Sequence, residues 1–390
     1  MLEIVKFLSR LVPSGLSAFT EVFKMWEEYY SNDYVAAAQR FRDQSQRLVD
    51  SGLAYDVQRL VLKEKGPMEE ELGIDICILG DSSSNKLLLS TSGIHGVEGY
   101  PGSAIQLYIM EEIERNGIPE GIAVVFVHAL NPWGMAWLRR VNETNSDLNR
   151  NFLPPNEDYL GEPEGYSKVD HLINPSKPPS KSGKMFTLEM LFHVIKYGMR
   201  QTKQTIAEGQ YTRPTAMQFG GESLQQGPKL FLAWLKEVLK GFDNIMAIDL
   251  HTGLGKSGQD TLLLNPGYSQ EGIEKMRQRF GKKIAALDSF FIAYRTRGDL
   301  HQGLMGRWPD KNWTCITQEF GTFSQLKVLK ALRSENAWTQ HGNVEDIYNH
   351  WSRHRLLRTF NPRNNGWREQ LLKRGRMLFE EGLLHLLEGE

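Results

Sequence analysis

An apolar run that stops at a glycine-rich turn constrains the fold of this chain more than any other stretch. Residues 86–91 have the composition of a buried strand, and the overlapping segment 90–102 holds four glycines together with His95 and Glu98. Because glycine permits sharp backbone turns, such a segment can aim an imidazole and a carboxylate at one point. A strand that ends in this way predicts half of a metal site. A catalytic zinc ion takes three protein ligands, so a third must come from elsewhere in the chain.

Other apolar segments predict an α/β fold. Residues 121–128 form a continuous apolar run, as expected for the middle of a mostly parallel sheet. Further strands are predicted at 54–62, 74–79, 86–90, 245–250 and 313–318, and helices at 34–48, 103–115, 188–207, 229–240, 271–287, 325–333 and 368–387. This alternation predicts one α/β domain with a mixed, mostly parallel sheet and helices on both faces.

Composition along the chain also predicts how it is divided. We expect a helical N-terminal extension at residues 1–30 and a catalytic domain at residues 31–390. Residues 153–185 are rich in Pro, Ser, Gly and Lys, which predicts a long loop, and loops of this length inside a domain are usually functional or disordered.

Composition excludes several classes of protein. The net charge of -1 gives no electrostatic case for binding nucleic acid or an anionic membrane. The N-terminus lacks the features of a signal peptide, and no run of about 18 apolar residues predicts a membrane span, so we expect a cytoplasmic protein. Cys77 and Cys315 lie in apolar runs and are predicted to be buried free thiols, which leaves no disulfide framework and no cysteine-type zinc site.

Two further strands end in residues suited to metal chemistry. The strand at 245–250 runs into His251, and ligands gather at the carboxyl ends of strands in open α/β sheets. We therefore expect His251 to be the third ligand of one zinc ion per chain, beside His95 and Glu98. The strand at 313–318 ends at Glu319, whose carboxylate has no histidine close to it in sequence. We expect Glu319 to act as the general base that takes a proton from water at the metal.

The segment 139–152 gathers three arginines and several amides in one turn. A guanidinium donates hydrogen bonds in a fork that matches a planar carboxylate. Arg150 is interpreted as the group that binds a carboxylate of the substrate, and the alternative is a salt bridge to Asp147 or Glu143. The spacing leaves open whether Arg139 or Arg140 faces the site.

Each motif has a structural interpretation when it stands alone. The pair His385 and Glu388 has the same spacing as His95 and Glu98, but it lies in an amphipathic terminal helix without glycines and is interpreted as a solvated helix end. Alone, His251 is more typical of a hydrogen-bonded histidine at a strand end. Four motifs that supply compatible parts favour an assembled active site.

Taken together and in order, these motifs resemble the zinc carboxypeptidase superfamily. The resemblance rests on His95-Gly-Val-Glu98, Asp147-Leu-Asn-Arg-Asn-Phe152, His251 and Glu319, covers roughly residues 30 to 390, and is greatest to an uncharacterised metallopeptidase-like branch, a domain of unknown function. It implies that His95, Glu98 and His251 bind zinc, that Glu319 is the general base and acid, that Asn149 and Arg150 hold a substrate carboxylate, and that Arg140, or alternatively Arg139, polarises the scissile carbonyl. Classical carboxypeptidases also carry a capping tyrosine late in the chain, whose counterpart these motifs do not locate; Tyr294 is one candidate.

The predicted function is a zinc-dependent hydrolase, a metallocarboxypeptidase-like enzyme that cleaves an amide bond adjacent to a free carboxylate. Its substrate is either a peptide C-terminus or a small N-acyl amino acid, as for the aspartoacylase and succinylglutamate desuccinylase relatives. A different class of function is a non-catalytic binding protein that retains the pocket, and the presence of every ligand and of the base argues against it. The expected partner is a peptide or small molecule with a free carboxylate, with no nucleic acid and no membrane.

Overall fold

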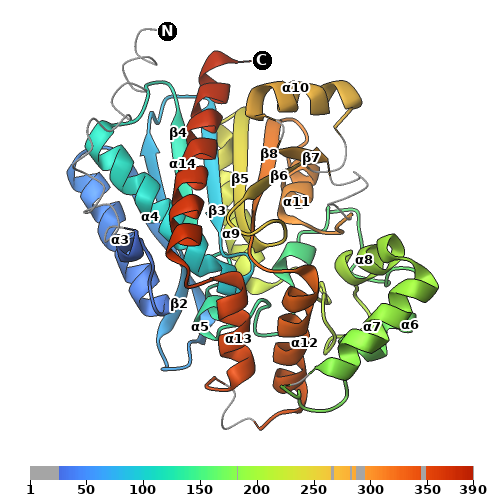
Figure 1. The fold of residues 1–390 in the computed structure, drawn as a ribbon. Coiled ribbons are helices and arrows are strands. Elements are labelled where there is room, and N and C mark those ends of the chain that lie inside the picture. Colours follow the sequence, from blue (N-terminus) through green and yellow to red (C-terminus); the bar gives the residue numbers. More distant parts are fainter. Residues whose placement is uncertain are drawn as a thin grey trace.

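A mixed eight-stranded sheet forms the centre of the molecule (Figure 1). The computed structural model describes residues 26–389 except 182, 265–267, 282, 287–294 and 344–347. The strands are β1 (Ala54–Lys65), β2 (Glu71–Gly80), β3 (Lys86–Ser92), β4 (Ala123–His128), β5 (Asn244–Gly253), β6 (Asp260–Leu264), β7 (Ile284–Ala286) and β8 (Asn312–Gly321), in the spatial order β1-β2-β4-β3-β5-β8-β6-β7.

The middle of the sheet is parallel, and its outer strands make antiparallel pairs. β3 pairs in parallel with β4 and β5, and β5 pairs in parallel with β8. β1 with β2, β2 with β4 and β6 with β8 are antiparallel, whereas the short β7 is parallel to β6. The predicted α/β class, with a mixed and mostly parallel sheet, is confirmed.

Helices cover both faces of this sheet. They are α3 (Tyr34–Asp50), α4 (Gly99–Asn116), α5 (Pro132–Ala136), α6 (Tyr166–Ile173), α7 (Lys184–Tyr197), α8 (Met199–Ala207), α9 (Gln226–Val238), α10 (Gln270–Phe280), α11 (Leu300–Arg307), α12 (Gln325–His341), α13 (Trp351–Phe360) and α14 (Asn365–Glu388). Leu88 of β3 packs into the apolar cluster that includes α4 and α14, whereas its neighbours Leu87 and Leu89 belong to the cluster that includes α9. Side chains alternate between the two faces of a strand, so a strand covered on both faces is apolar throughout.

Several predicted boundaries were wrong. The segment 153–185 is not one loop, because it contains α6. The helix predicted at 188–207 is two helices, α7 and α8, which meet at Gly198. The helix predicted at 271–287 ends with α10 at Phe280, and the chain continues into β7. β6, α11 and α13 were not predicted from the sequence.

The N-terminal part of the described chain lies against the sheet's helices. Of the predicted extension at 1–30, residues 1–25 lie outside the described residues. Trp26 and Tyr29 are buried, and both rings contact the ring of Tyr108 on α4 edge-on, with centroids 5.5 and 5.2 Å apart. Cys77 and Cys315 are buried and free, as predicted. None of the described helices is long and apolar enough to cross a membrane.

Candidate metal centre and active site

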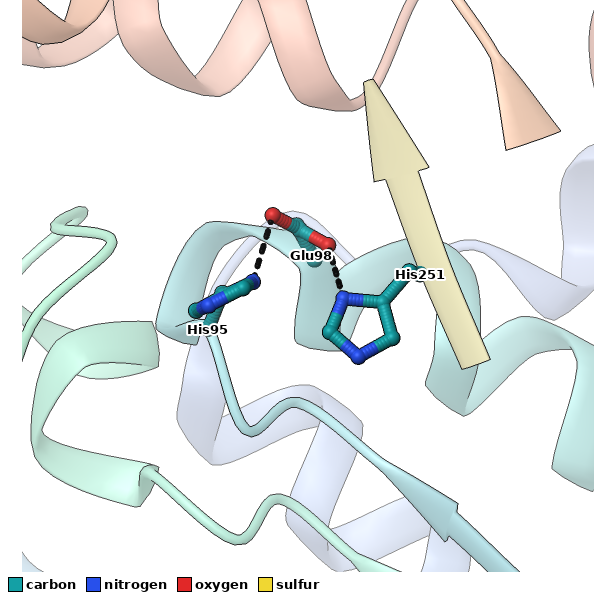
Figure 2. A group of neighbouring side chains, drawn as sticks. All are labelled: His95, Glu98 and His251. Atoms are coloured by element: carbon teal, nitrogen blue, oxygen red, sulfur yellow. Dashed lines mark hydrogen bonds and ion pairs between the residues drawn. The ribbon is translucent and has the colours of Figure 1, made fainter. Parts of the chain in front are cut away.

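Two strand ends bring the predicted ligands together. His95 precedes the short 3-10 helix η3 (Gly96–Glu98) that follows β3, Glu98 is the last residue of η3, and His251 lies near the end of β5. All three side chains are buried, and one ligand atom from each lies within 4.8 Å of the others. Figure 2 shows both imidazole rings turned toward the carboxylate of Glu98. A Cβ at Gly96 would lie 2.0 Å from the backbone carbon of Gly134, so only glycine fits this turn.

Each imidazole presents one nitrogen to Glu98 and the other to a buried aspartate. His95 Nδ1 lies 3.0 Å from Glu98 Oε1, and His251 Nδ1 lies 3.1 Å from Oε2. The Nε2 atoms lie 3.0 Å from Asp147 Oδ1 and 2.6 Å from Asp249 Oδ2 respectively. In the neutral form of each ring, a hydrogen on Nε2 satisfies the aspartate behind it and leaves the Nδ1 lone pair directed at the shared centre. When His251 is protonated, its Nδ1–H instead donates a hydrogen bond to Glu98. This carboxylate–histidine arrangement is the one that metal-binding histidines usually adopt.

The donor set fits a divalent metal ion. Although His95 Nδ1 is close to Glu98, its geometry makes no hydrogen bond, so a buried nitrogen points into the cluster with its hydrogen-bonding capacity unused. Two imidazoles and one carboxylate are a known ligand set of catalytic zinc. The carboxylate of Asp249 adds buried negative charge beside these residues, which also favours a cation, whereas that of Asp147 is paired with Arg140.

The charges in the cluster shift one another's pKa values. Burial raises the pKa of Glu98, but the charge of His95 and the hydrogen bond from His251 outweigh it and hold that pKa below its usual range. Burial lowers the pKa of His251, and the charge of Asp249 outweighs it and raises that pKa well above its ordinary value. The backbone N–H of Thr252 also donates to Glu98 Oε2, at 3.0 Å. The ionised form of Glu98 is therefore the stable one.

Glu319 lies across from the cluster on the neighbouring strand. The register of β5 and β8 pairs it with His251, so both side chains stand on the same face of the sheet. Its Oε1 accepts a hydrogen bond from the backbone N–H of Leu254 at 2.8 Å. Burial and the charge of Glu98 raise the pKa of Glu319 to about 7. A carboxyl group with a pKa near neutrality can both take up and release a proton.

Arg140, and not Arg139, lines the site. The Arg140 guanidinium forms an ion pair with Asp147, and its Nε lies 4.0 Å from Glu98 Oε1. Arg139 turns into the protein interior, where its Nε lies 2.8 Å from Glu335 Oε1. The structure therefore distinguishes two neighbouring arginines that the sequence left as alternatives.

Asn149 and Arg150 also line the site, on the 3-10 helix η4 (Leu148–Arg150). The buried guanidinium of Arg150 donates from Nη2 and Nε to the carbonyl oxygen of Ala207, at 2.6 and 3.0 Å, and from Nη1 to the carbonyl of Asn149, at 2.6 Å. Asp147, which was the alternative partner of Arg150, pairs with Arg140 instead. A Cβ at Gly209 would lie 2.7 Å from Arg150 Cδ, so the stem of this arginine occupies the space beside a glycine.

Comparison with known proteins gives a family for the chain. Residues 30–374 match the family described as a protein of unknown function (DUF2817). The chain belongs to the DUF2817 family. This confirms the predicted membership of a domain of unknown function. No match was found among curated proteins.

Solved structures similar to this DUF2817 protein include several peptidase-related proteins. Carboxypeptidase A from Helicoverpa armigera is 12% identical with a TM-score of 0.44, over 80% of this chain and 70% of that chain. Thrombin-activatable fibrinolysis inhibitor is 11% identical with a TM-score of 0.45, over 93% and 81%. A murein-tripeptide amidase from Escherichia coli O157 is 15% identical with a TM-score of 0.36, over 73% and 92%. With TM-scores below 0.5, these likenesses say nothing of this chain's activity.

In this DUF2817 protein, a cavity of about 450 Å³ is lined both by the cluster of His95, Glu98 and His251 and by apolar side chains. At one end it is lined by polar side chains, namely His95, Glu98, Arg140, Asn149, Arg150, His251 and Glu319. Further out, its wall is made by α7, α8 and α12, with the apolar residues Met190, Leu191, Val194, Met199, Ile206, Leu326, Leu329 and Leu332. The cavity therefore suits a molecule with both a charged and an apolar part.

Sequence reasoning missed the role of the two aspartates. Asp249 and His251 are two residues apart on one strand, a spacing that puts both on the same face, so this pair was detectable. Asp147 was considered only as a partner of Arg150. The candidate capping residue Tyr294 lies outside the described residues. His385 is half-buried and contacts Thr314 Oγ1 at 3.0 Å, so the prediction of a solvated helix end holds only for the exposed Glu388, which pairs with Arg279.

Proposed function

We propose that this DUF2817 protein is a zinc-dependent hydrolase that cleaves an amide bond next to a free carboxylate. The observation that carries the proposal is the buried cluster of His95, Glu98 and His251, which opens on the cavity with Glu319 opposite. These three residues would hold one zinc ion and leave a coordination position open, as catalytic zinc sites do. When bound, zinc would supply Lewis acidity toward water and toward a carbonyl oxygen.

The remaining chemistry comes from side chains around the cluster. Glu319, with its pKa near 7, takes a proton from the attacking water and passes it to the leaving amine. The guanidinium of Arg140 lies on the cluster's side of the cavity and stabilises the negative charge that develops on the carbonyl oxygen. Asn149 and Arg150 bind the free carboxylate, since a guanidinium has five N–H groups and the backbone carbonyls described above occupy three of them.

The apolar wall of the cavity supports a second candidate substrate, an N-acyl amino acid with an apolar acyl group. A peptide with a C-terminal carboxylate and an N-acyl amino acid both contain an amide beside a carboxylate. An apolar acyl group would have α7, α8 and α12 to lie against, while its carboxylate reaches Arg150. An N-acyl amino acid with an apolar acyl group is therefore the candidate to test beside peptides.

Metal content tests the first part of the proposal. We expect one zinc ion per chain in the purified protein, and loss of that zinc in His95→Ala and His251→Ala with the fold largely intact. His385→Ala is the matched control, because it removes a histidine of the same His-x-x-Glu spacing outside the cluster. Full zinc occupancy in either ligand variant, measured by elemental analysis, would show that the ion is held elsewhere.

Substrate pairs test the second part. A peptide library and a panel of N-acyl amino acids of rising acyl length are each offered with the carboxylate free and amidated. We expect turnover only when the carboxylate is free. Equal kcat/KM for the two forms would overturn the carboxylate rule. Zinc binding without turnover of any member would favour the non-catalytic binding protein.

A further inference from the structure

One side of α7 is apolar and yet exposed. Met185, Leu188, Phe192 and Ile195 are 67%, 47%, 61% and 71% exposed. Their spacing of three, four and three residues places them on one side of the helix. Leu191, on the same helix, and Met199, at the start of α8, are also more than half exposed and extend the patch. We call these six residues the α7 face.

The opposite side of α7 is occupied by the protein itself. Phe186 and Met190 are buried in an apolar cluster with residues of α6, and Leu326 and Leu329 of α12 pack against it. Figure 1 shows α6, α7 and α8 grouped at one side of the molecule, so the α7 face lies at its periphery. A helix that is apolar on all sides is normally covered on all sides. An exposed apolar patch of this kind is typical of a surface that binds a membrane or another molecule.

The chain segments next to the α7 face carry mostly positive charges. Lys177 and Lys181 precede it, and Lys196, Arg200 and Lys203 follow or flank it. From residue 177 to residue 203 the sequence contains one acidic residue, Glu189, whose charge acts on Arg333 of α12. The expectation of no membrane partner came from the net charge of the whole chain, and the local charge here has the opposite sign.

We propose that the α7 face docks on an anionic lipid surface. Its apolar side chains would enter the boundary between headgroups and acyl chains, and the surrounding cations would contact the anionic headgroups, as in helices that lie in a membrane interface. A second copy of the chain is the less suitable occupant. A two-fold contact between identical patches would bring the same basic residues against one another.

The α7 face adjoins the cavity, so docking would also bring the cavity close to the lipid. Leu191 and Met199 belong both to the α7 face and to the lining of the cavity. Docking therefore places the apolar end of the cavity against the lipid, where the apolar group of a lipid-borne substrate could enter. This consequence rests on the proposed function, whereas the docking itself does not.

Sedimentation of the full-length protein with vesicles tests the docking without any substrate. The probes are vesicles of phosphatidylcholine alone and of phosphatidylcholine mixed equally with phosphatidylglycerol. We expect binding to the mixed vesicles that weakens as salt is added. Phe192→Glu combined with Ile195→Glu should weaken the partition coefficient about 100-fold or more, because burial of each side chain is worth roughly a factor of ten or more. Lys181→Glu combined with Lys196→Glu should remove the preference for the mixed vesicles.

The control is Met68→Glu combined with Met377→Glu, which places the same charges at exposed methionines outside the α7 face and should leave binding unchanged. All the substituted side chains are exposed, so the variants should fold, and circular dichroism checks this. Equal vesicle binding by the wild-type protein and the Phe192/Ile195 variant would overturn the proposal. A second result would also overturn it. In that result the wild-type protein binds neither kind of vesicle and forms a dimer in sedimentation velocity without vesicles, and the Phe192/Ile195 variant does not form this dimer. A failed hydrolysis assay leaves the vesicle result intact, so the two proposals fail separately.

Discussion

His251 is held between two carboxylates, with Nδ1 3.1 Å from Glu98 and Nε2 2.6 Å from Asp249. The second contact sets the ring's orientation and its tautomer, and Thr91 Oγ1 in turn donates to Asp249 at 2.7 Å. At the scale of single residues, the candidate metal centre thus depends on groups outside its three proposed ligands.

Asp249→Asn tests this dependence. The amide keeps the size of the side chain but removes the charge that stabilises the Nε2–H form of His251. We expect zinc affinity to fall about 10- to 100-fold, as measured by competition with a chromophoric chelator. Asp75→Asn, which changes another buried aspartate away from the cluster, should leave the affinity unchanged. Equal affinities for wild type and Asp249→Asn would mean that the ring is positioned by other contacts.

Glu319 has a different residue-scale role, since it is not needed to complete the ligand set. Glu319→Gln should retain zinc and lose about 10²–10⁴-fold in kcat, the usual contribution of a general acid–base group. The comparison uses zinc content and single-turnover rates on an established substrate. Near wild-type turnover would identify another group as the base.

At the scale of elements, the position of Arg150 depends on three separate segments. η4 carries the residue, the end of α8 supplies the carbonyl of Ala207, and Gly209 leaves room for the arginine's stem. The direction of the guanidinium is therefore set by how α8 packs beside η4, and not by the local sequence of η4 alone.

Gly209→Ala should displace Arg150 while leaving the metal centre in place. We expect KM for a free-carboxylate substrate to rise about 10- to 100-fold, the effect of losing a charged hydrogen bond, with zinc content unchanged. Gly209 has a φ of +108°, so the substitution also strains the backbone. Gly161→Ala is the control, because Gly161 also has a positive φ of +91° but has no atoms within 4 Å of an added Cβ. A similar rise in KM for both variants would point to backbone strain and not to Arg150.

The elements that the sequence predicted best are those whose signal is local. The strands that became β3, β4 and β5 are continuous apolar runs. The candidate ligands His95 and Glu98 follow β3, and His251 lies near the end of β5. α6 was missed because its segment is rich in Pro, Ser and Lys. The choice between Arg139 and Arg140 could not be made, because it depends on Glu335, which is 196 residues away from Arg139 and beside it only in the fold.

At the scale of the whole molecule, a second charged cluster lies in the interior, outside the candidate active site. His128, at the end of β4, is fully buried and stacks on Phe41 with ring centroids 4.9 Å apart. Its Nε2 lies 3.1 Å from Ser103 Oγ, and its Nδ1 lies 4.0 Å from Asp75 Oδ2. This cluster ties α3 and α4 to the sheet, so its protonation affects the stability of the entire domain.

The pKa values in this cluster predict how stability changes with pH. Burial, followed by the charges of Arg42 and Arg59, lowers the pKa of His128 from 6.5 to about 3. As the pH falls below 6.5, the unfolded chain binds a proton at His128 that the folded chain does not bind until near pH 3. The free energy of unfolding therefore decreases as the pH falls through this window. Asp75 acts in the opposite direction, because burial raises its pKa from 3.8 to about 6 and the folded chain takes up that proton first.

His128→Asn separates the two effects. Its neutral amide does not titrate, while Asp75 and the histidines of the metal centre remain in both proteins and cancel in the comparison. Urea unfolding of both proteins with a chelator present gives the difference in their free energies of unfolding. We expect His128→Asn to be the less stable protein near neutral pH, because it loses the packing on Phe41. That deficit should shrink by about 2 kcal/mol between about pH 7.5 and about pH 5. Over this range only the wild-type chain loses stability through His128, which takes up a proton when unfolded but not when folded. A deficit that stays constant over this range would show that His128 takes up its proton at the same pH in the folded and unfolded chains. A deficit that grows as the pH falls would show that the folded chain holds His128 in its charged form beside Asp75.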